Sequence, residues 1–106
     1  MTEAQSAPRL PALIREAFDA TQEPPTPERL AEIDAALRVE VVRLQETARA
    51  LAEHRPHRSR DWYALVNAVD RADYALGFQN QTGFAGALGV AELARRVLEL
   101  ERAITS

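Results

Sequence analysis

The feature that most constrains this chain is the stretch from residue 28 to residue 54, which contains neither Gly nor Pro. Apolar residues recur along it at steps of three and four, the spacing of one face of an α-helix. Thr26 and Pro27 form a typical helix start, because a hydroxyl caps free backbone N–H groups and Pro is tolerated at the first position. The pattern predicts one helix over residues 27–54, about 42 Å long. Its apolar face consists of Leu30, Ile33, Leu37, Val41, Leu44, Ala48 and Leu51.

Three other segments show the same helical spacing and predict helices over about residues 10–20, 60–77 and 83–104. No segment alternates polar and apolar residues with the period of a strand. The sequence therefore predicts the all-α class, as an elongated antiparallel three-helix bundle with a short additional N-terminal helix. Because 106 residues suit one domain, residues 10–106 are expected to form a single helical domain after a flexible N-terminus of residues 1–9.

All four glycines lie between residues 77 and 89, which marks a break before the last predicted helix. Gly77 is expected in the left-handed conformation that often ends a helix, and Asn80 or Thr82 is expected to cap the next one. Gly86 and Gly89 are interpreted as allowing close contact between helices. No strand precedes these glycines and no Lys follows them, so they do not form a nucleotide-binding loop.

Composition narrows the classes of function. The absence of Cys excludes disulfides and thiolate metal sites and favours a reducing cytoplasm. The net charge of −3 argues against a nucleic-acid partner. No apolar run approaches the roughly 18 residues of a membrane span, and the first residues lack the pattern of a signal peptide. All 13 basic residues are Arg, which together with the abundance of Ala is typical of a GC-rich genome and predicts an actinobacterial source.

Basic residues are concentrated in residues 54–60, which hold three Arg and both His of the chain. The simpler interpretation is that these cations stabilise the negative C-terminal end of the preceding helix. In a second interpretation, His57, Arg58 and Arg60 hold a phosphate or carboxylate, because the start of the next helix also favours an anion. Two His without Cys are too few for a metal site, so no metal is expected. Ser59 is expected to cap the next helix.

Four polar residues lie along one side of the predicted helix over residues 60–77, namely Tyr63, Asn67, Asp70 and Tyr74. One hypothesis is that they form a binding face for a partner or a small molecule, because phenol rings offer a large contact area with a hydrogen-bonding end. The alternative is a half-buried row that packs its rings against the bundle and keeps its hydroxyls in water.

Charged residues of the two longest predicted helices are spaced for ion pairs within one helix. Asp34 and Arg38 lie four residues apart, as do Glu92 and Arg96. Exposed pairs of this kind contribute about 0.3–0.5 kcal/mol each. We interpret them as parts of solvent-facing surfaces that mark no site.

The residues needed for catalysis are largely missing. Only Ser59 among the serines lies near a His, and it is expected to act as a cap. The long Arg-bearing helix resembles the helical chorismate mutases, which implies that Arg38, Arg43 and Arg49 hold carboxylates. However, the site of that family relies on a Lys, and this chain has none. The chain is therefore predicted not to be an enzyme, with no catalytic residue and no cofactor.

Several motifs between residues 24 and 104 carry a second resemblance. They are Pro24-Pro25, the Leu- and Arg-rich stretch over residues 36–44, a helix of small and aromatic residues, and Leu93-Ala-Arg-Arg-Val97. This pattern resembles a group of small streptomycete helical proteins of unknown function that are labelled as associated with natural-product biosynthesis. The resemblance implies an accessory or regulatory role in an actinobacterium and carries over no catalytic residues.

These features predict a non-catalytic helical interaction module with an accessory or regulatory role. The long helix over residues 27–54 and the Ala-rich helix faces are expected to present more apolar surface than one short chain can bury. The protein is therefore expected to dock to a protein partner or to self-associate. The alternative is a small-molecule-responsive regulator that binds an anionic or aromatic ligand near the helix over residues 60–77. That hypothesis requires Tyr63, Asn67, Asp70 and Arg58 to converge on one cavity.

Overall fold

The computed structural model describes residues 2–78 and 83–106, with the backbone alone for residues 2–8. The described residues form no strand, which confirms the predicted all-α class. Within the same part of the chain, no helix is long and apolar enough to cross a membrane. The helices are α1 (Thr2–Asp19), α2 (Pro27–Ala52), α3 (Arg60–Leu76) and α4 (Gly83–Thr105).

The observed helix bounds differ most from the expected ones at the N-terminus, where α1 begins at Thr2 rather than near residue 10. The bounds of α2, α3 and α4 agree closely with the predicted ranges. Met1 lies outside the described residues, and so do Asn80 and Thr82, the two cap candidates for the last helix. The flexibility expected for residues 1–9 stays a prediction.

The long helix α2 is unbroken, as its sequence predicts. Thr26 caps it, since the Thr26 hydroxyl accepts a hydrogen bond of 3.1 Å from the backbone N–H of Arg29. Fully burying a Leu, Ile or Val side chain contributes about 1.5–3 kcal/mol, so the apolar face of α2 is a main source of stability. Of the predicted face only Leu51 is half-buried, while the buried members are Leu30, Ile33, Leu37, Val41, Leu44 and Ala48.

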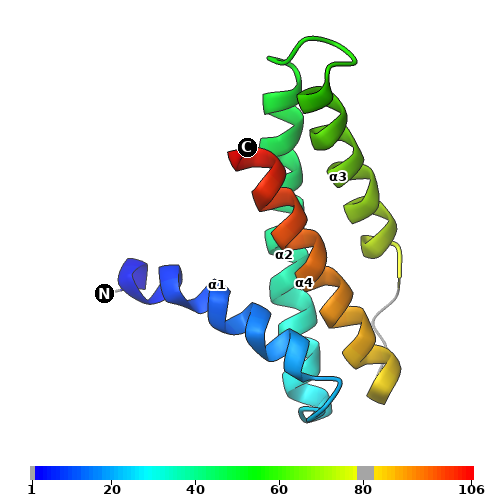
Figure 1. Cartoon of the computed structure of the whole chain (residues 1–106). Coiled ribbons are helices and arrows are strands. Elements are labelled where there is room, and N and C mark those ends of the chain that lie inside the picture. Colours follow the sequence, from blue (N-terminus) through cyan, green and yellow to red (C-terminus); the bar gives the residue numbers. More distant parts are fainter. Residues whose placement is uncertain (1, 79–82) are drawn as a thin grey trace.

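Helices α2, α3 and α4 lie side by side, with α3 running opposite to the other two (Figure 1). Helix α1 crosses the lower part of this group, and its N-terminal end points away from it (Figure 1). The radius of gyration is 14.6 Å, compared with about 13 Å for a compact domain of this length. Helix α2, which is about 39 Å long at 1.5 Å per residue, accounts for most of the long axis of 45 Å.

Helices α3 and α4 cover α2 with residues of contrasting size. The larger buried side chains include Leu65 on α3 and Leu93 and Leu100 on α4. Between them lie alanines whose exposed fractions are near zero. Because an Ala side chain is small, it lets two helix backbones approach closely. These residues are Ala48, Ala68, Ala72, Ala87 and Ala94.

Gln45 is a buried polar residue within this apolar interface, with an exposed fraction of 2%. Its amide nitrogen donates hydrogen bonds of 3.1 Å to the backbone carbonyl of Val69 and 2.8 Å to the carboxylate of Asp73. Because a buried amide is costly without partners, these bonds fix the position of α2 along α3.

Helix α1 is held against the rest of the chain by its C-terminal half. Ile14 and Ala17 are buried there, and so is Ala20 directly after the helix. Beside them, the guanidinium of Arg29 at the start of α2 donates two hydrogen bonds of 2.7 and 2.6 Å to the carboxylate of Glu16. These hydrogen bonds lower the pKa of Glu16 below its ordinary value.

The turn glycines do not behave as the sequence suggested. Gly77 has a φ of −71°, so the expectation of a left-handed helix end there is wrong. Arg38 instead satisfies the end of α3, by donating to the backbone carbonyls of Leu76 and Phe78. Among the described residues, positive φ occurs at Gly83 (63°) and at Arg58 (65°).

We expect Gln45→Ala to lower the free energy of unfolding by about 1–3 kcal/mol, because it removes two buried hydrogen bonds and leaves a space between α2 and α3. Urea denaturation followed by circular dichroism measures this change. The control is Glu46→Ala at the next, exposed position. Equal midpoints for the two variants would contradict the role of Gln45.

The Glu16–Arg29 contact makes α1 sensitive to acid. A carboxyl whose pKa is lowered in the folded state contributes stability above its ordinary pKa of 4.5, and this is lost as the pH falls below that value. At pH 7 we expect Glu16→Gln to lower the free energy of unfolding by up to about 1 kcal/mol, the range of an exposed ion pair. As the pH is lowered below 4.5, the difference in unfolding temperature between the variant and the unaltered protein should shrink, because the Glu16 carboxyl becomes protonated in the folded state as well.

The control for this prediction is Glu32→Gln, because Glu32 pairs with the same Arg29 but lies on the same helix and does not hold α1. Hydrogen exchange of α1 amides at pH 7 reports the docking directly. Faster exchange in Glu32→Gln than in Glu16→Gln would show that the contact does not hold α1.

Candidate functional site

The basic elbow, residues 54–60, exposes the three residues that sequence analysis selected there, His57, Arg58 and Arg60. Ser59 caps α3, as predicted, by accepting a hydrogen bond of 3.2 Å from the backbone N–H of Trp62. The ring of His57 packs edge-on against Trp62, with 4.7 Å between ring centroids. Among the described residues, no ion pair holds Arg58 or Arg60 in a fixed orientation. The elbow therefore places His57 in an aromatic contact and leaves Arg58 and Arg60 exposed to solvent.

The polar row on α3 lies on the outer face of the helix. Asn67 and Asp70 are exposed, and the exposed fractions of Tyr63 and Tyr74 are 45% and 74%. The two rings lie about 16 Å apart along the helix axis, because 11 residues separate them at 1.5 Å per residue.

The structure divides the row among three places. Tyr63 packs against Trp62 at a centroid distance of 5.0 Å. Asp70 lines a crevice of 290 Å³ between α2 and α3, and Tyr74 lines a different pocket at the far end of α3. The residues do not converge with Arg58 on one cavity.

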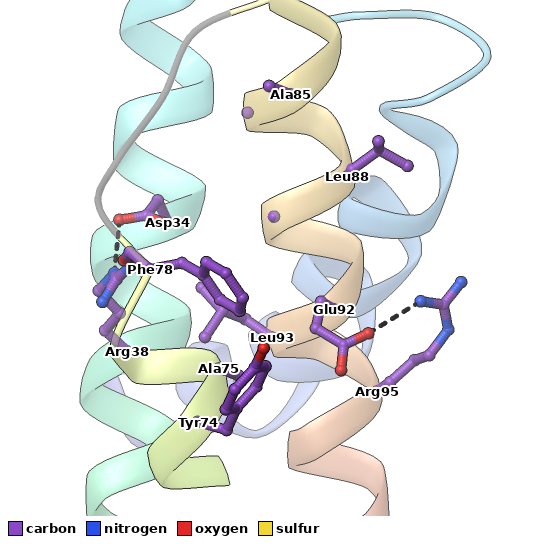
Figure 2. A pocket seen from close by; sticks show the side chains of 12 residues that line it. Asp34, Arg38, Tyr74, Ala75, Phe78, Ala85, Leu88, Glu92, Leu93 and Arg95 are labelled. Atoms are coloured by element: carbon purple, nitrogen blue, oxygen red, sulfur yellow. Dashed lines mark hydrogen bonds and ion pairs between the residues drawn. The ribbon is translucent and has the colours of Figure 1, made fainter. Parts of the chain in front are cut away.

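The larger of these hollows, which we call the α3–α4 pocket, has a volume of 470 Å³. It lies where α3 ends and α4 begins, beside the N-terminal half of α2 (Figure 2). Its apolar lining comes from two rings at the end of α3 and from small or branched residues of α4. The apolar lining residues include Tyr74, Phe78, Ala85, Gly86, Leu88 and Gly89.

Arg38 and Asp34 form the α2 side of the α3–α4 pocket. The carboxylate of Asp34, exposed to only 7%, accepts a hydrogen bond of 2.9 Å from the Nε of Arg38. The two terminal nitrogens of Arg38 donate to the carbonyls of Leu76 at 2.8 Å and Phe78 at 2.5 Å. The expectation that this pair faces solvent is wrong, because the guanidinium crosses from α2 to the C-terminal end of α3.

Charged residues of α4 form the opposite rim of the pocket. Glu92 accepts a hydrogen bond of 3.1 Å from Arg95, and Figure 2 shows this pair beside the aromatic rings. Arg96 lies 3.3 Å from the same carboxylate and also donates to Glu99, so the predicted pairing of Glu92 with Arg96 is confirmed. Each acid and each base that lines the pocket has a partner within the chain.

The arginines compared with a chorismate mutase site are also engaged within the chain. Arg43 donates to Glu40, which raises the pKa of the Arg43 guanidinium, and Arg49 lies 3.7 Å from Asp73. Arg38 is turned toward α3. Among the described side chains, no three His, Cys, Asp or Glu gather closely enough to hold a metal ion.

Comparison with protein families gives one result that decides membership. A model described as a family of unknown function, DUF6415, matches residues 9–104. The chain belongs to this family. All residues that line the α3–α4 pocket lie within the matched range, so the pocket is part of the DUF6415 region of this chain. No curated protein and no solved structure matches the chain.

Replacing two glycines of the DUF6415 region by Ala is expected to change the free energy of unfolding in opposite directions. An added Cβ at Gly89 meets nothing within 4 Å, so the expected close helix contact is absent there. Gly89→Ala should raise the free energy of unfolding by about 0.5–1 kcal/mol through helix propensity. Gly83→Ala should lower it by about 1 kcal/mol, because a side chain is strained at a φ of 63°. Chemical denaturation measures both, and a destabilising Gly89→Ala would show that a neighbouring group occupies this space.

Proposed function

We propose that this DUF6415 protein is a non-catalytic helical interaction module that self-associates through the outer face of α2. Its scaffold is an elongated antiparallel three-helix bundle of α2, α3 and α4, with α1 attached at one end. The supporting observation is an apolar stripe on the solvent side of α2, where a helix of a monomeric protein normally carries polar residues.

The apolar stripe consists of Ala31, Ala35, Val39 and Val42, which follow one another at steps of four, four and three residues. All four are exposed, and the exposed fractions of Val39 and Val42 are 70% and 44%. The stripe lies on the side of α2 opposite to the buried face. Its small residues allow a second helix to approach closely, as Ala residues do inside the bundle.

The charges at the ends of the stripe favour a second copy in antiparallel orientation. Glu28 precedes the stripe and Arg49 follows it, and both are exposed. When two α2 helices pack antiparallel about a centre between residues 38 and 39, Ala35 meets Val42 of the partner subunit. In the same register Glu28 meets Arg49 of the partner subunit, twice by symmetry. Parallel packing would instead place each charge against its own copy, which is repulsive.

Light scattering and sedimentation equilibrium test this proposal. We expect a concentration-dependent dimer, and we expect Val39→Glu combined with Val42→Glu to shift it to monomer, because burying four carboxylates in the interface is costly. The matched control is Leu98→Glu on α4, where the exposed fraction is 43%. A protein that is monomeric at all concentrations, or dissociation by the control as well, would refute self-association through this face.

A charge reversal tests the register. Glu28→Arg should weaken the dimer by placing arginines against each other, and adding Arg49→Glu should restore it. Arg49→Glu also removes the exposed contact with Asp73, so the thermal stability of each variant is measured alongside. Failure of the double variant to recover would exclude this antiparallel pairing.

We also propose that the protein works in the cytoplasm of an actinobacterium, as an accessory or regulatory component linked to natural-product biosynthesis. The absence of Cys and the exclusive use of Arg among its basic residues support the setting, and the resemblance described above supports the role. Copurification of an enzyme with the tagged protein from a native host tests the role.

A ligand-responsive regulator is the second candidate function. The observation that favours it is the α3–α4 pocket, which includes Tyr74 of the predicted row. The pocket lies at the C-terminal end of α3, away from the basic elbow. The pocket therefore supports a ligand at the C-terminal end of α3, whereas the hypothesis from sequence placed the ligand beside Arg58, near the start of α3.

A further inference from the structure

We infer that the α3–α4 pocket binds a neutral aromatic small molecule, held between the rings of Tyr74 and Phe78 and the glycine-containing face of α4. This inference rests on the second candidate function. It is independent of self-association, because no residue of the apolar stripe lines the pocket.

The size and shape of the pocket suit a small molecule. Its 470 Å³ falls within the range of about 300–1,000 Å³ that is typical of ligand sites. Gly86 and Gly89 contribute backbone rather than side chains to one wall, and a Cβ added at Gly89 would meet open space. A flat group can therefore lie directly against α4 at this wall.

The aromatic residues define the preferred chemistry of the ligand. Tyr74 and Phe78 form an edge-to-face pair, with ring centroids 5.1 Å apart and an angle of 85° between the rings. Both rings are at least half exposed, and they lie between α3 and α4 (Figure 2). A third ring that stacks on this pair would cover apolar area and gain the aromatic contacts that such rings favour.

The charges around the pocket select against an anion. Arg38 lines the pocket, and its donors are already engaged by Asp34 and by two backbone carbonyls. Arg95 pairs with Glu92 at the rim. An anionic ligand would also lie beside the carboxylates of Asp34 and Glu92, which line the pocket and repel it, whereas a neutral ring meets no such repulsion. This distinguishes the two ligand classes that the sequence left open.

A pair of fluorescent probes that differ in one charged group tests the inference. N-phenylnaphthylamine is neutral, and anilinonaphthalene sulfonate adds a sulfonate to the same rings. We expect the neutral probe to bind the full chain with enhanced, blue-shifted emission and the sulfonate to bind about tenfold more weakly. Equal or tighter binding of the sulfonate would overturn the assignment of a neutral ligand.

Substitutions locate the probe. Gly89→Leu fills the pocket from the α4 side, and Tyr74→Ala removes one exposed ring. We expect each to weaken binding of the neutral probe about tenfold. The matched controls are Phe84→Ala and Tyr63→Ala, which remove exposed rings that do not line the pocket. Unchanged binding in Gly89→Leu, or equal loss in the controls, would overturn the site.

The readouts separate this inference from the proposed dimer. Circular dichroism confirms that Gly89→Leu keeps its helices, and Val39→Glu with Val42→Glu should leave probe binding unchanged. Loss of probe binding in that double variant would show that the pocket depends on the α2 interface, which would overturn the independent site.

Discussion

The burial of the apolar face of α2 between α3 and α4 is the interaction on which the rest of the structure depends. Ile33, Leu37 and Val41 are completely inaccessible to solvent, and each contributes about 1.5–3 kcal/mol by leaving water. Because α3 and α4 each pack on α2, their relative positions follow from that shared contact. The small residues among the larger ones permit the close helix approach that this packing needs.

The same helix links the core to the candidate binding site. Asp34 is almost fully buried and orients Arg38, whose guanidinium holds the last carbonyls of α3. This contact places Tyr74 and Phe78 where α3 ends, at the mouth of the α3–α4 pocket. The opposite side of α2 carries the apolar stripe. One helix thus supports the core, one wall of the pocket and the proposed interface.

The N-terminal caps of α2 and α3 could be predicted from the sequence, whereas the end of α3 could not. The caps Thr26 and Ser59 satisfy backbone groups three residues ahead, so their spacing alone is informative. The expected left-handed conformation of Gly77 is wrong because the backbone carbonyl of Leu76 at the end of α3 accepts a hydrogen bond from Arg38 instead. Arg38 lies 39 positions before Gly77, so no local pattern indicates this contact. The four residues of the predicted polar row do lie on one face of α3. However, the rigid helix keeps the two ends of the row about 16 Å apart, so the row forms no single site.

The sequence by itself determined the helices and the faces they bury, because periodicity and capping arise from contacts within about four residues along the chain. The tertiary structure alone decided which polar residues became functional candidates. Arg38 and Gln45 have the spacing of ordinary surface residues, and their partners on α3 or directly after it lie 24 to 40 positions away. The pocket likewise forms where α2, α3 and α4 come together in space. The spacing of residues within one helix does not predict which residues of different helices become neighbours.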